Sequence, residues 1–138
     1  TYFYHPVSEM EHKSWFSSLP LQKDQILFGI ETIEENKLIG TCGFHDINHI
    51  CRKAELIIKI SDKNEWGKGY GKDALQILID FGFSDLNLRR IWLRVLADND
   101  RAIKLYQNAG FITEGLLKED HYIQGEYKDV IIMAFIRK

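Results

Sequence analysis

The sequence predicts an α+β fold in one domain. Three observations support this prediction: a length of 138 residues, three strand-like runs in the first half of the chain, and a change to helical spacing after a glycine-rich loop. Hydrophobic residues make up 45% and charged residues 28% of the chain, which is the balance of an ordinary globular domain.

The first half of the chain predicts one helix and three strands. Ser8 and Glu11 have the spacing of a capping box, which predicts a short helix over residues 8–19, ending before Pro20. Three runs rich in β-branched and aromatic residues predict an antiparallel meander. These strands lie at residues 26–33, 38–44 and 54–60, with turns at 35–36 and 45–52.

The second half predicts a crossover unit followed by two more strands. Apolar residues from Ala74 to Phe81 recur at helical spacing and predict a helix after the glycine loop. A second helix begins at residues 98–100 and stops at Gly110. The strands lie at residues 88–96, 111–117 and 130–136. Because a strand–helix–strand crossover joins parallel strands, strands 54–60 and 88–96 should be parallel, and the rest of the sheet antiparallel.

Composition also bears on partners and compartment. The net charge is −2 and the isoelectric point is near 6.2, so we expect neither a nucleic acid nor a membrane as a partner. The apolar runs are far shorter than the ~20 residues that span a bilayer. Cys42 and Cys51 fit no disulfide framework or zinc pattern, and we expect reduced thiols in a cytoplasmic chain. The scattered histidines lack metal spacing, and we expect no metal.

The glycine-rich loop at residues 66–71 has the composition of an anion site. Gly67, Gly69 and Gly71 let the backbone curl around a phosphate, and the helix that follows presents unpaired N–H groups to it. Lys68 and Lys72 add charge beside it. The alternative is a tight turn whose glycines only supply positive φ. The pattern disfavours a P-loop, because the first glycine and the Ser/Thr of that motif are missing.

A dinucleotide fingerprint is a second way to use this loop. Residues 69–74 satisfy G-x-G-x-x-A, but antiparallel strands precede them and the chain after them is too short for a doubly wound sheet. Because the motif itself matches, a small dinucleotide-binding oxidoreductase remains an alternative.

Longer motifs resemble a known family. Residues 66–74, the strand 91–96 and the block Asn-Asp-Arg-Ala-Ile-Lys-Leu-Tyr-Gln-Asn-Ala-Gly-Phe at 99–111 resemble the acetyl-CoA-binding core of the GNAT superfamily of N-acetyltransferases. The later residues resemble the branch that contains ribosomal-protein N-terminal and spermidine acetyltransferases. These residues are Glu114-Gly115, Tyr122, Gly125, Tyr127-Lys128-Asp129 and Met133.

The resemblance covers residues 8–137 and implies one GNAT domain over residues 1–138. It implies a twisted sheet with helices on both faces, in which strands 54–60 and 88–96 splay apart around the cofactor. Trp66 stands where the family pattern has Gln or Arg. The family's first strand and helix would precede Thr1.

The resemblance further implies the reaction: an acetyl group moves from acetyl-CoA to a primary amine by direct transfer in a ternary complex, without a metal. The backbone from Ile58 to Ile60 would pair with the pantetheine arm and donate an N–H to the thioester oxygen. Asn99 would contact the cofactor, cap its helix, or do both. The pyrophosphate would be held by backbone N–H groups of Gly67, Lys68, Gly69, Tyr70, Gly71 and Lys72.

Two side chains would carry the proton transfers. The family places a tyrosine at Tyr106 as the general acid for the leaving thiolate, whereas its position on an apolar helix face is also that of a core aromatic. Glu55 would be the general base, directly or through a water relay. Otherwise Glu55 is an exposed strand residue.

The acceptor is left open by these motifs. A protein N-terminal amine, a polyamine, an amino sugar and an antibiotic are all compatible. Trp15, Phe16, Tyr122 and Tyr127 either line an acceptor pocket or belong to the core. By analogy with the family we expect a homodimer. A non-catalytic acetyl-CoA-binding regulatory module is the alternative from another functional class.

Overall fold

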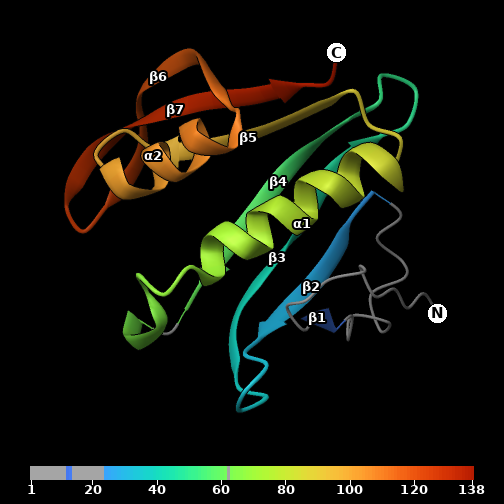
Figure 1. Cartoon of the computed structure of the whole chain (residues 1–138). Coiled ribbons are helices and arrows are strands. Elements are labelled where there is room, and N and C mark those ends of the chain that lie inside the picture. Colours follow the sequence, from blue (N-terminus) through green and yellow to red (C-terminus); the bar gives the residue numbers. More distant parts are fainter. Residues whose placement is uncertain (1–11, 14–23, 62) are drawn as a thin grey trace.

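The computed structural model describes residues 12–13, 24–61 and 63–138 (Figure 1). The elements in chain order are β1 (His12–Lys13), β2 (Ile26–Glu31), β3 (Leu38–Asn48), β4 (Lys53–Ile60), the 3-10 turn η1 (Lys63–Glu65), α1 (Tyr70–Ser84), β5 (Arg90–Leu96), α2 (Asp100–Ala109), β6 (Ile112–Ile123) and β7 (Glu126–Ile136).

All described strands belong to one seven-stranded sheet in the order β1-β2-β3-β4-β5-β7-β6. Among these strands, β4 and β5 are parallel neighbours, and every other neighbouring pair is antiparallel. The structure therefore confirms the mixed, mostly antiparallel sheet and the crossover through α1.

The parallel strands β4 and β5 separate soon after they pair. Their pairing covers Lys53–Arg90, Ala54–Ile91 and Glu55–Trp92. Beyond these pairs, β4 follows β3 as far as Ile60, and β5 follows β7 as far as Leu96. Each strand is thus held on its outer side, and the two inner edges diverge (Figure 1). The predicted splay is present.

Helix α1 fixes one side of this divergence. Its buried face includes Leu75, Leu78 and Phe81, and the Phe81 ring meets Phe28 of β2 edge-on at 5.6 Å. Burying side chains of this size stabilises the fold by about 1.5–3 kcal/mol each. Gly82 lets the helix come close to the sheet, since a Cβ there would lie 2.9 Å from Ile91 Cδ1. The C-terminal part of α1 is therefore packed closely against the sheet.

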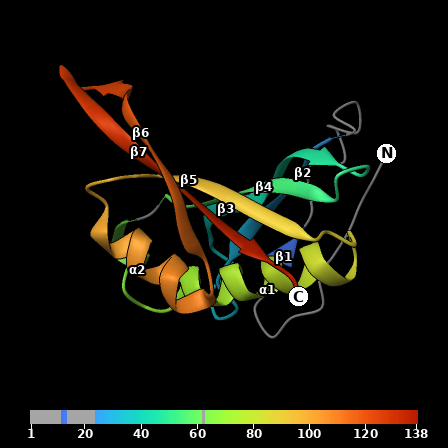
Figure 2. The same ribbon diagram turned by 90° about the horizontal axis from the view of Figure 1, so that it is seen from above.

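Helix α2 lies on the same side of the sheet as α1 (Figure 2). Its C-terminal end is joined to β7 and α1 by ring contacts from Phe111 to Phe135 (5.6 Å) and from Phe135 to Phe83 (5.2 Å). The prediction of helices on both faces is not met by α1 and α2, and the helix predicted at residues 8–19 lies mostly outside the described residues. In the described part of the chain, no helix is long and apolar enough to cross a membrane.

Three boundaries differ from the sequence prediction. His12 and Lys13 were expected in a helix but pair with Ile30 and Gly29 as β1. The expected turn at residues 45–52 is strand as far as Asn48, because a register shift between His45 and Asn48 carries β3 past Asp46, whose φ is 51°. The turn proper is capped by Asn48 Oδ1, which accepts the N–H of residues 50 and 51.

The last hairpin is longer than predicted. Strand β6 continues to Ile123 and β7 begins at Glu126, with Gln124 and Gly125 both at positive φ in the two-residue turn. Residues 118–122 are mostly polar and exposed, so the apolar alternation that marks a strand is missing there.

Candidate active site

The glycine-rich loop joins η1 to the start of α1. Gly67 and Gly69 have φ values of 81° and 88°, in the left-handed region that favours glycine. No side chain caps the helix at Gly69, and a Cβ at this position would meet nothing within 4 Å. The first N–H groups of α1 therefore have no intrahelical or capping side-chain partner, and the backbone at Gly69 is open to a ligand, as an anion site requires.

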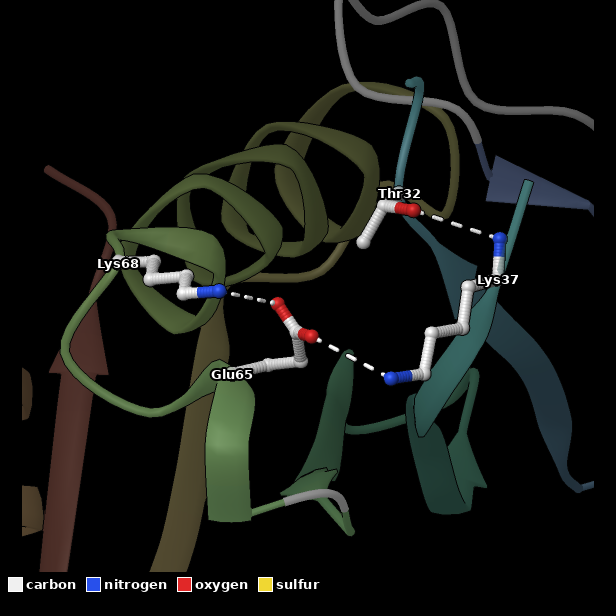
Figure 3. A network of polar contacts seen from close by, with 4 residues as sticks. All are labelled: Thr32, Lys37, Glu65 and Lys68. Atoms are coloured by element: carbon white, nitrogen blue, oxygen red, sulfur yellow. Dashed lines mark hydrogen bonds and ion pairs between the residues drawn. The ribbon is translucent and has the colours of Figure 1, made fainter. Parts of the chain in front are cut away.

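A buried carboxylate anchors this loop (Figure 3). Glu65 is only 7% exposed and accepts from Lys68 Nζ at 3.1 Å and from Lys37 Nζ at 3.4 Å. The backbone N–H of Lys37 in turn donates to Thr32 Oγ1 at 3.3 Å, which ties the cluster to the β2–β3 turn. The hydrogen bond to Glu65 raises the pKa of Lys68. The Lys68 ammonium, expected beside a phosphate, lies instead on this carboxylate.

Trp66 connects the loop to the end of β4. Its indole N–H donates to the carbonyl oxygen of Ile60 at 2.9 Å, and its ring is 47% exposed. The Arg101 guanidinium carbon lies 5.6 Å, and Lys63 Nζ 6.0 Å, from the ring centroid. Trp66 is therefore fixed by the hydrogen bond of its indole N–H, and the faces of its ring contact the two cations.

The backbone of β4 turns alternate N–H groups toward the gap. The N–H of Ser61 donates to Ile39 of β3 at 2.7 Å, whereas the carbonyl of Ile60 accepts from Trp66. Because successive residues of a strand direct their backbone groups to opposite sides, the N–H groups of Ile60 and Ile58 face away from β3. They lie on the side where β5 has diverged, as their predicted pairing with a pantetheine arm requires.

Tyr106 lies on α2, which packs against the start of α1. Leu105 Cδ2 lies 3.8 Å from the place that a Cβ on Gly71 would take. Tyr106 is 8% exposed, its ring meets Phe111 at 5.9 Å, and burial raises its pKa to about 12. The phenol is therefore neutral at every physiological pH. Asn99 caps this helix, since its Oδ1 accepts the N–H of Ala102 at 3.2 Å.

Glu55 is buried, not exposed, and it is paired. Its side chain accepts two hydrogen bonds from Arg94 of β5, Nε to Oε2 at 2.9 Å and Nη2 to Oε1 at 3.1 Å. This bidentate pair bridges β4 and β5 where their backbone pairing ends. Ile91 faces α1, so alternation puts Trp92, Arg94 and Glu55 on the opposite face of the sheet.

More negative charge gathers around Arg94. Its pKa is raised first by the hydrogen bond to Glu55 and further by the charges of Asp120 on β6 and Asp46 on β3. Sequence reasoning missed Arg94. The sequence did contain a signal for it: Arg94 is a charged residue within an apolar strand. In the parallel register it lies on the same face of the sheet as Glu55.

Tyr122 and Tyr127 are not core residues. They are 66% and 64% exposed, and their rings meet at 4.9 Å near the tip of the β6–β7 hairpin. Tyr127 also lines a cavity of about 430 Å³ at the end of β5. The cavity is otherwise lined by Ala97, Asp98, Lys118, Glu119, Lys128 and Asp129. Trp15 and Phe16 lie outside the described residues.

Neither cysteine forms a disulfide. Cys42 is free and buried, and burial raises its pKa to about 12, so its thiol belongs to the core. Cys51 is free and exposed. Across residues 24–61 and 63–138, no three His, Cys, Asp or Glu side chains are grouped as metal ligands.

Comparison with known proteins identifies the family to which this architecture belongs. Residues 1–112 match the model of an acetyltransferase (GNAT) domain. The chain is 36% identical over 122 residues to an uncharacterized N-acetyltransferase of Bacillus licheniformis, covering 88% of this chain and 68% of that protein. It is 39% identical over 110 residues to spermidine N(1)-acetyltransferase of Vibrio cholerae, covering 80% of this chain and 62% of that enzyme.

Solved structures give the same result. A spermidine N-acetyltransferase from Vibrio cholerae, described as dodecameric, superposes with a TM-score of 0.80 at 33% identity, covering 88% of this chain and 70% of that one. The ribosomal-protein-serine acetyltransferase of Escherichia coli is 32% identical over 103 residues, which cover 75% of this chain and 57% of that enzyme. The chain thus spans between about half and two thirds of the length of most such relatives. Both groups named by the sequence motifs are represented, and the chain belongs to the GNAT acetyltransferase family.

Proposed function

We propose that this chain transfers the acetyl group of acetyl-CoA to a primary amine by direct attack in a ternary complex. The observation that carries the proposal is the divergence of β4 and β5 directly beside the glycine loop. A diphosphate on the loop and an extended arm in the gap would occupy two parts of one continuous site.

The residues present fit such a ligand. The left-handed backbone at Gly67 and Gly69, with open space beyond Gly69, suits a diphosphate against unpaired N–H groups. The N–H groups of Ile58 and Ile60 suit the amides of a pantetheine arm and the thioester oxygen. Acetyl-CoA supplies an activated acetyl group, and the chain's part is to hold it and to move protons.

Tyr106 is proposed as the general acid. Its raised pKa keeps the phenol protonated at neutral pH, so that it can donate a hydrogen bond and then a proton as negative charge develops on the departing sulfur. Burial also keeps the ring in one orientation between α2 and Phe111. A neutral donor with a fixed position is what the departure of a thiolate needs.

Glu55 is proposed as the base that receives the amine proton through a water molecule. The guanidinium of Arg94 uses one acceptor site on each carboxylate oxygen, and each oxygen has a second lone pair. Arg94 therefore orients the carboxylate and leaves acceptor sites on it available for a water molecule. We expect Glu55→Gln to lower kcat, because an amide accepts no proton and offers Arg94 only one acceptor oxygen.

A polyamine is the acceptor that we propose to test first. Asp46 and Asp120 lie near Arg94 on the sheet, and carboxylates at such positions attract a chain of ammonium groups. Relatives of this chain include spermidine N(1)-acetyltransferases. Protein N-terminal amines, amino sugars and aminoglycoside antibiotics belong in the same panel.

The test is a thiol-release assay with acetyl-CoA over that panel, with Glu55→Gln alongside the unchanged chain. The proposal expects release with at least one class of amine. If acetyl-CoA raises the melting temperature but no amine gives free thiol, the result supports a non-catalytic acetyl-CoA-binding module and contradicts an enzyme. If acetyl-CoA does not bind, the proposed function is wrong.

We also propose that copies of the chain associate and that it works in the cytoplasm. Strand β6 is an outer strand of the sheet and exposes Ile112, Leu116 and Leu117. Two free cysteines suit a reducing compartment. Size-exclusion chromatography with light scattering would test the homodimer, with Leu116→Lys as the variant expected to dissociate it.

A further inference from the structure

Of the two lysines that the sequence places beside the glycine loop, Lys68 and Lys72, the one inside the loop is already paired. Lys68 follows Gly67 directly, yet its ammonium is bound to the buried carboxylate of Glu65 at 3.1 Å. Glu65 also holds Lys37 and is thereby fixed between two elements. A diphosphate on the loop carries negative charge that this neutralised lysine offsets poorly.

A cation from the other helix lies on the loop instead. Arg101 is in the first turn of α2, and its Nη2 lies 3.4 Å from the place that a Cβ on Gly67 would take. Within the described part of the chain, no carboxylate forms an ion pair with Arg101. Its guanidinium therefore keeps donors for a ligand at the site where the backbone is most exposed.

Trp66 holds this arginine in place. The ring is fixed through its N–H to the carbonyl oxygen of Ile60, and the guanidinium carbon lies over the ring, 5.6 Å from its centroid. Cation–π contacts at exposed sites are worth about 0.5–1 kcal/mol, enough to favour one rotamer of a long side chain. A cation–π contact occupies no N–H donor, so the N–H groups of the guanidinium remain available for phosphate oxygens.

We propose that Arg101 supplies the positive charge for the diphosphate of CoA at the glycine loop, and that Trp66 is the residue that positions it. This inference rests on the proposed function, because it takes the loop as the CoA site. It assigns to α2 a binding role that the sequence of the loop alone gives to Lys68 and Lys72.

The test is isothermal titration with CoA, without an acetyl group or acceptor, so that turnover plays no part. Losing one charge-assisted contact should weaken CoA binding about tenfold in Arg101→Ala. Arg101→Lys should recover part of the loss, since a lysine keeps the charge without the planar fork. The matched control is Arg89→Ala, which removes an equally exposed arginine at the opposite end of β5 and should stay within about twofold.

Trp66 is tested by its coupling to Arg101. Trp66→Leu should weaken CoA binding by a smaller factor, and Trp66→Phe, which keeps a ring face, should bind nearly as the unchanged chain does. In the double variant Trp66→Leu with Arg101→Ala, the loss should equal that of Arg101→Ala alone. Fully additive losses would remove Trp66 from the positioning role.

Dephospho-CoA separates the two phosphate groups of the ligand. The inference expects Arg101→Ala to lose the same factor with CoA and with dephospho-CoA, because both contain the diphosphate. A loss seen only with CoA would assign Arg101 to the 3′-phosphate and overturn the inference. Equal affinity of Arg101→Ala and the unchanged chain for CoA would also overturn it while leaving the proposed function intact. Failure of the unchanged chain to bind CoA would instead refute the proposed function.

Discussion

At the scale of single residues, burial acts differently on the two proposed proton-transfer groups. Tyr106 is surrounded by apolar groups, so burial raises its pKa to about 12 and keeps it neutral. Glu55 is equally buried, but a bidentate arginine compensates its charge. The same sheet thus holds a neutral donor on its helix side and a paired carboxylate on the other.

Removing the Tyr106 hydroxyl should lower turnover. In Tyr106→Phe the ring contact with Phe111 is kept, so the fold should remain and the proton donor alone is lost. We expect kcat to fall at least tenfold, which corresponds to about 1.4 kcal/mol of activation free energy. Thiol release at saturating acetyl-CoA measures this, and an unchanged kcat would exclude Tyr106 as the general acid.

The raised pKa of Tyr106 also predicts how stability depends on pH. In the unfolded chain the phenol ionises near pH ~10, whereas in the folded chain it ionises at about 12. Between these values the phenol ionises in the unfolded chain but not in the folded chain. The contribution of Tyr106 to the free energy of unfolding is therefore fully present below pH ~10 and is lost as pH rises above it. Urea unfolding of the chain and of Tyr106→Phe at several pH values isolates this contribution. The chain should lose stability relative to Tyr106→Phe above pH ~10, and parallel pH curves would contradict the prediction.

At the scale of elements, the candidate site depends on how closely β3 lies along β4. Gly40 of β3 pairs with Ile60, and a Cβ on Gly40 would lie far inside contact distance of the carbonyl oxygen of Lys59. Strand β4 supplies the proposed N–H groups at Ile58 and Ile60. Its outer neighbour therefore determines the position of the gap.

Gly40→Ala should consequently affect both stability and ligand binding. A clash with backbone has no flexible side chain to relieve it, and we expect the free energy of unfolding to drop by at least ~2 kcal/mol. CoA affinity should fall as β4 shifts. Gly115→Ala in β6 is the matched control, because a Cβ there meets nothing within 4 Å. Its effect on chemical denaturation should stay within about 0.5 kcal/mol, and equal effects of the two variants would refute the steric account.

The cap of α2 allows the two proposed roles of Asn99 to be separated. Asn99→Ala removes the acceptor for the N–H of Ala102 and should cost about 1 kcal/mol of stability. Asn99→Ser keeps a capping oxygen and should restore that stability. If Asn99 also contacts CoA, Asn99→Ser should still bind it about fivefold more weakly in calorimetry. Normal CoA affinity in Asn99→Ser would leave Asn99 as a cap only.

At the scale of the whole molecule, the sequence was most informative where structure is local. The helical spacing after Gly71 and the capping residue Asn99 correctly predicted α1 and α2, because both signals act within a few residues. The predicted end of β3 was wrong because the residues of the bulge at Asp46 resemble a turn in the sequence.

The partners of the site residues could not be found in this way. Glu55 meets Arg94, 39 residues away, and Glu65 meets Lys37, 28 residues away. Such pairs depend on strand register and on how two elements approach, which hydrophobic periodicity does not contain. Glu65 gave no signal at all, since it stands in a polar segment that resembles a solvated loop.

The divided sheet makes a final prediction about ligand-induced stability. The half formed by β1 to β4 meets the half formed by β5, β7 and β6 through three parallel residue pairs, the Glu55–Arg94 bridge and the helices. A ligand lying between β4 and β5 would add contacts to both halves and should stabilise the native state by mass action. At a concentration 100-fold above Kd, acetyl-CoA should add about 2.7 kcal/mol, a rise in Tm of roughly 5–10 °C for a domain of this size. NAD, which has a diphosphate but no pantetheine arm, should give a much smaller shift in the same thermal unfolding experiment. A larger shift with NAD would favour a dinucleotide-binding oxidoreductase, because the loop would then bind its ligand without using the gap.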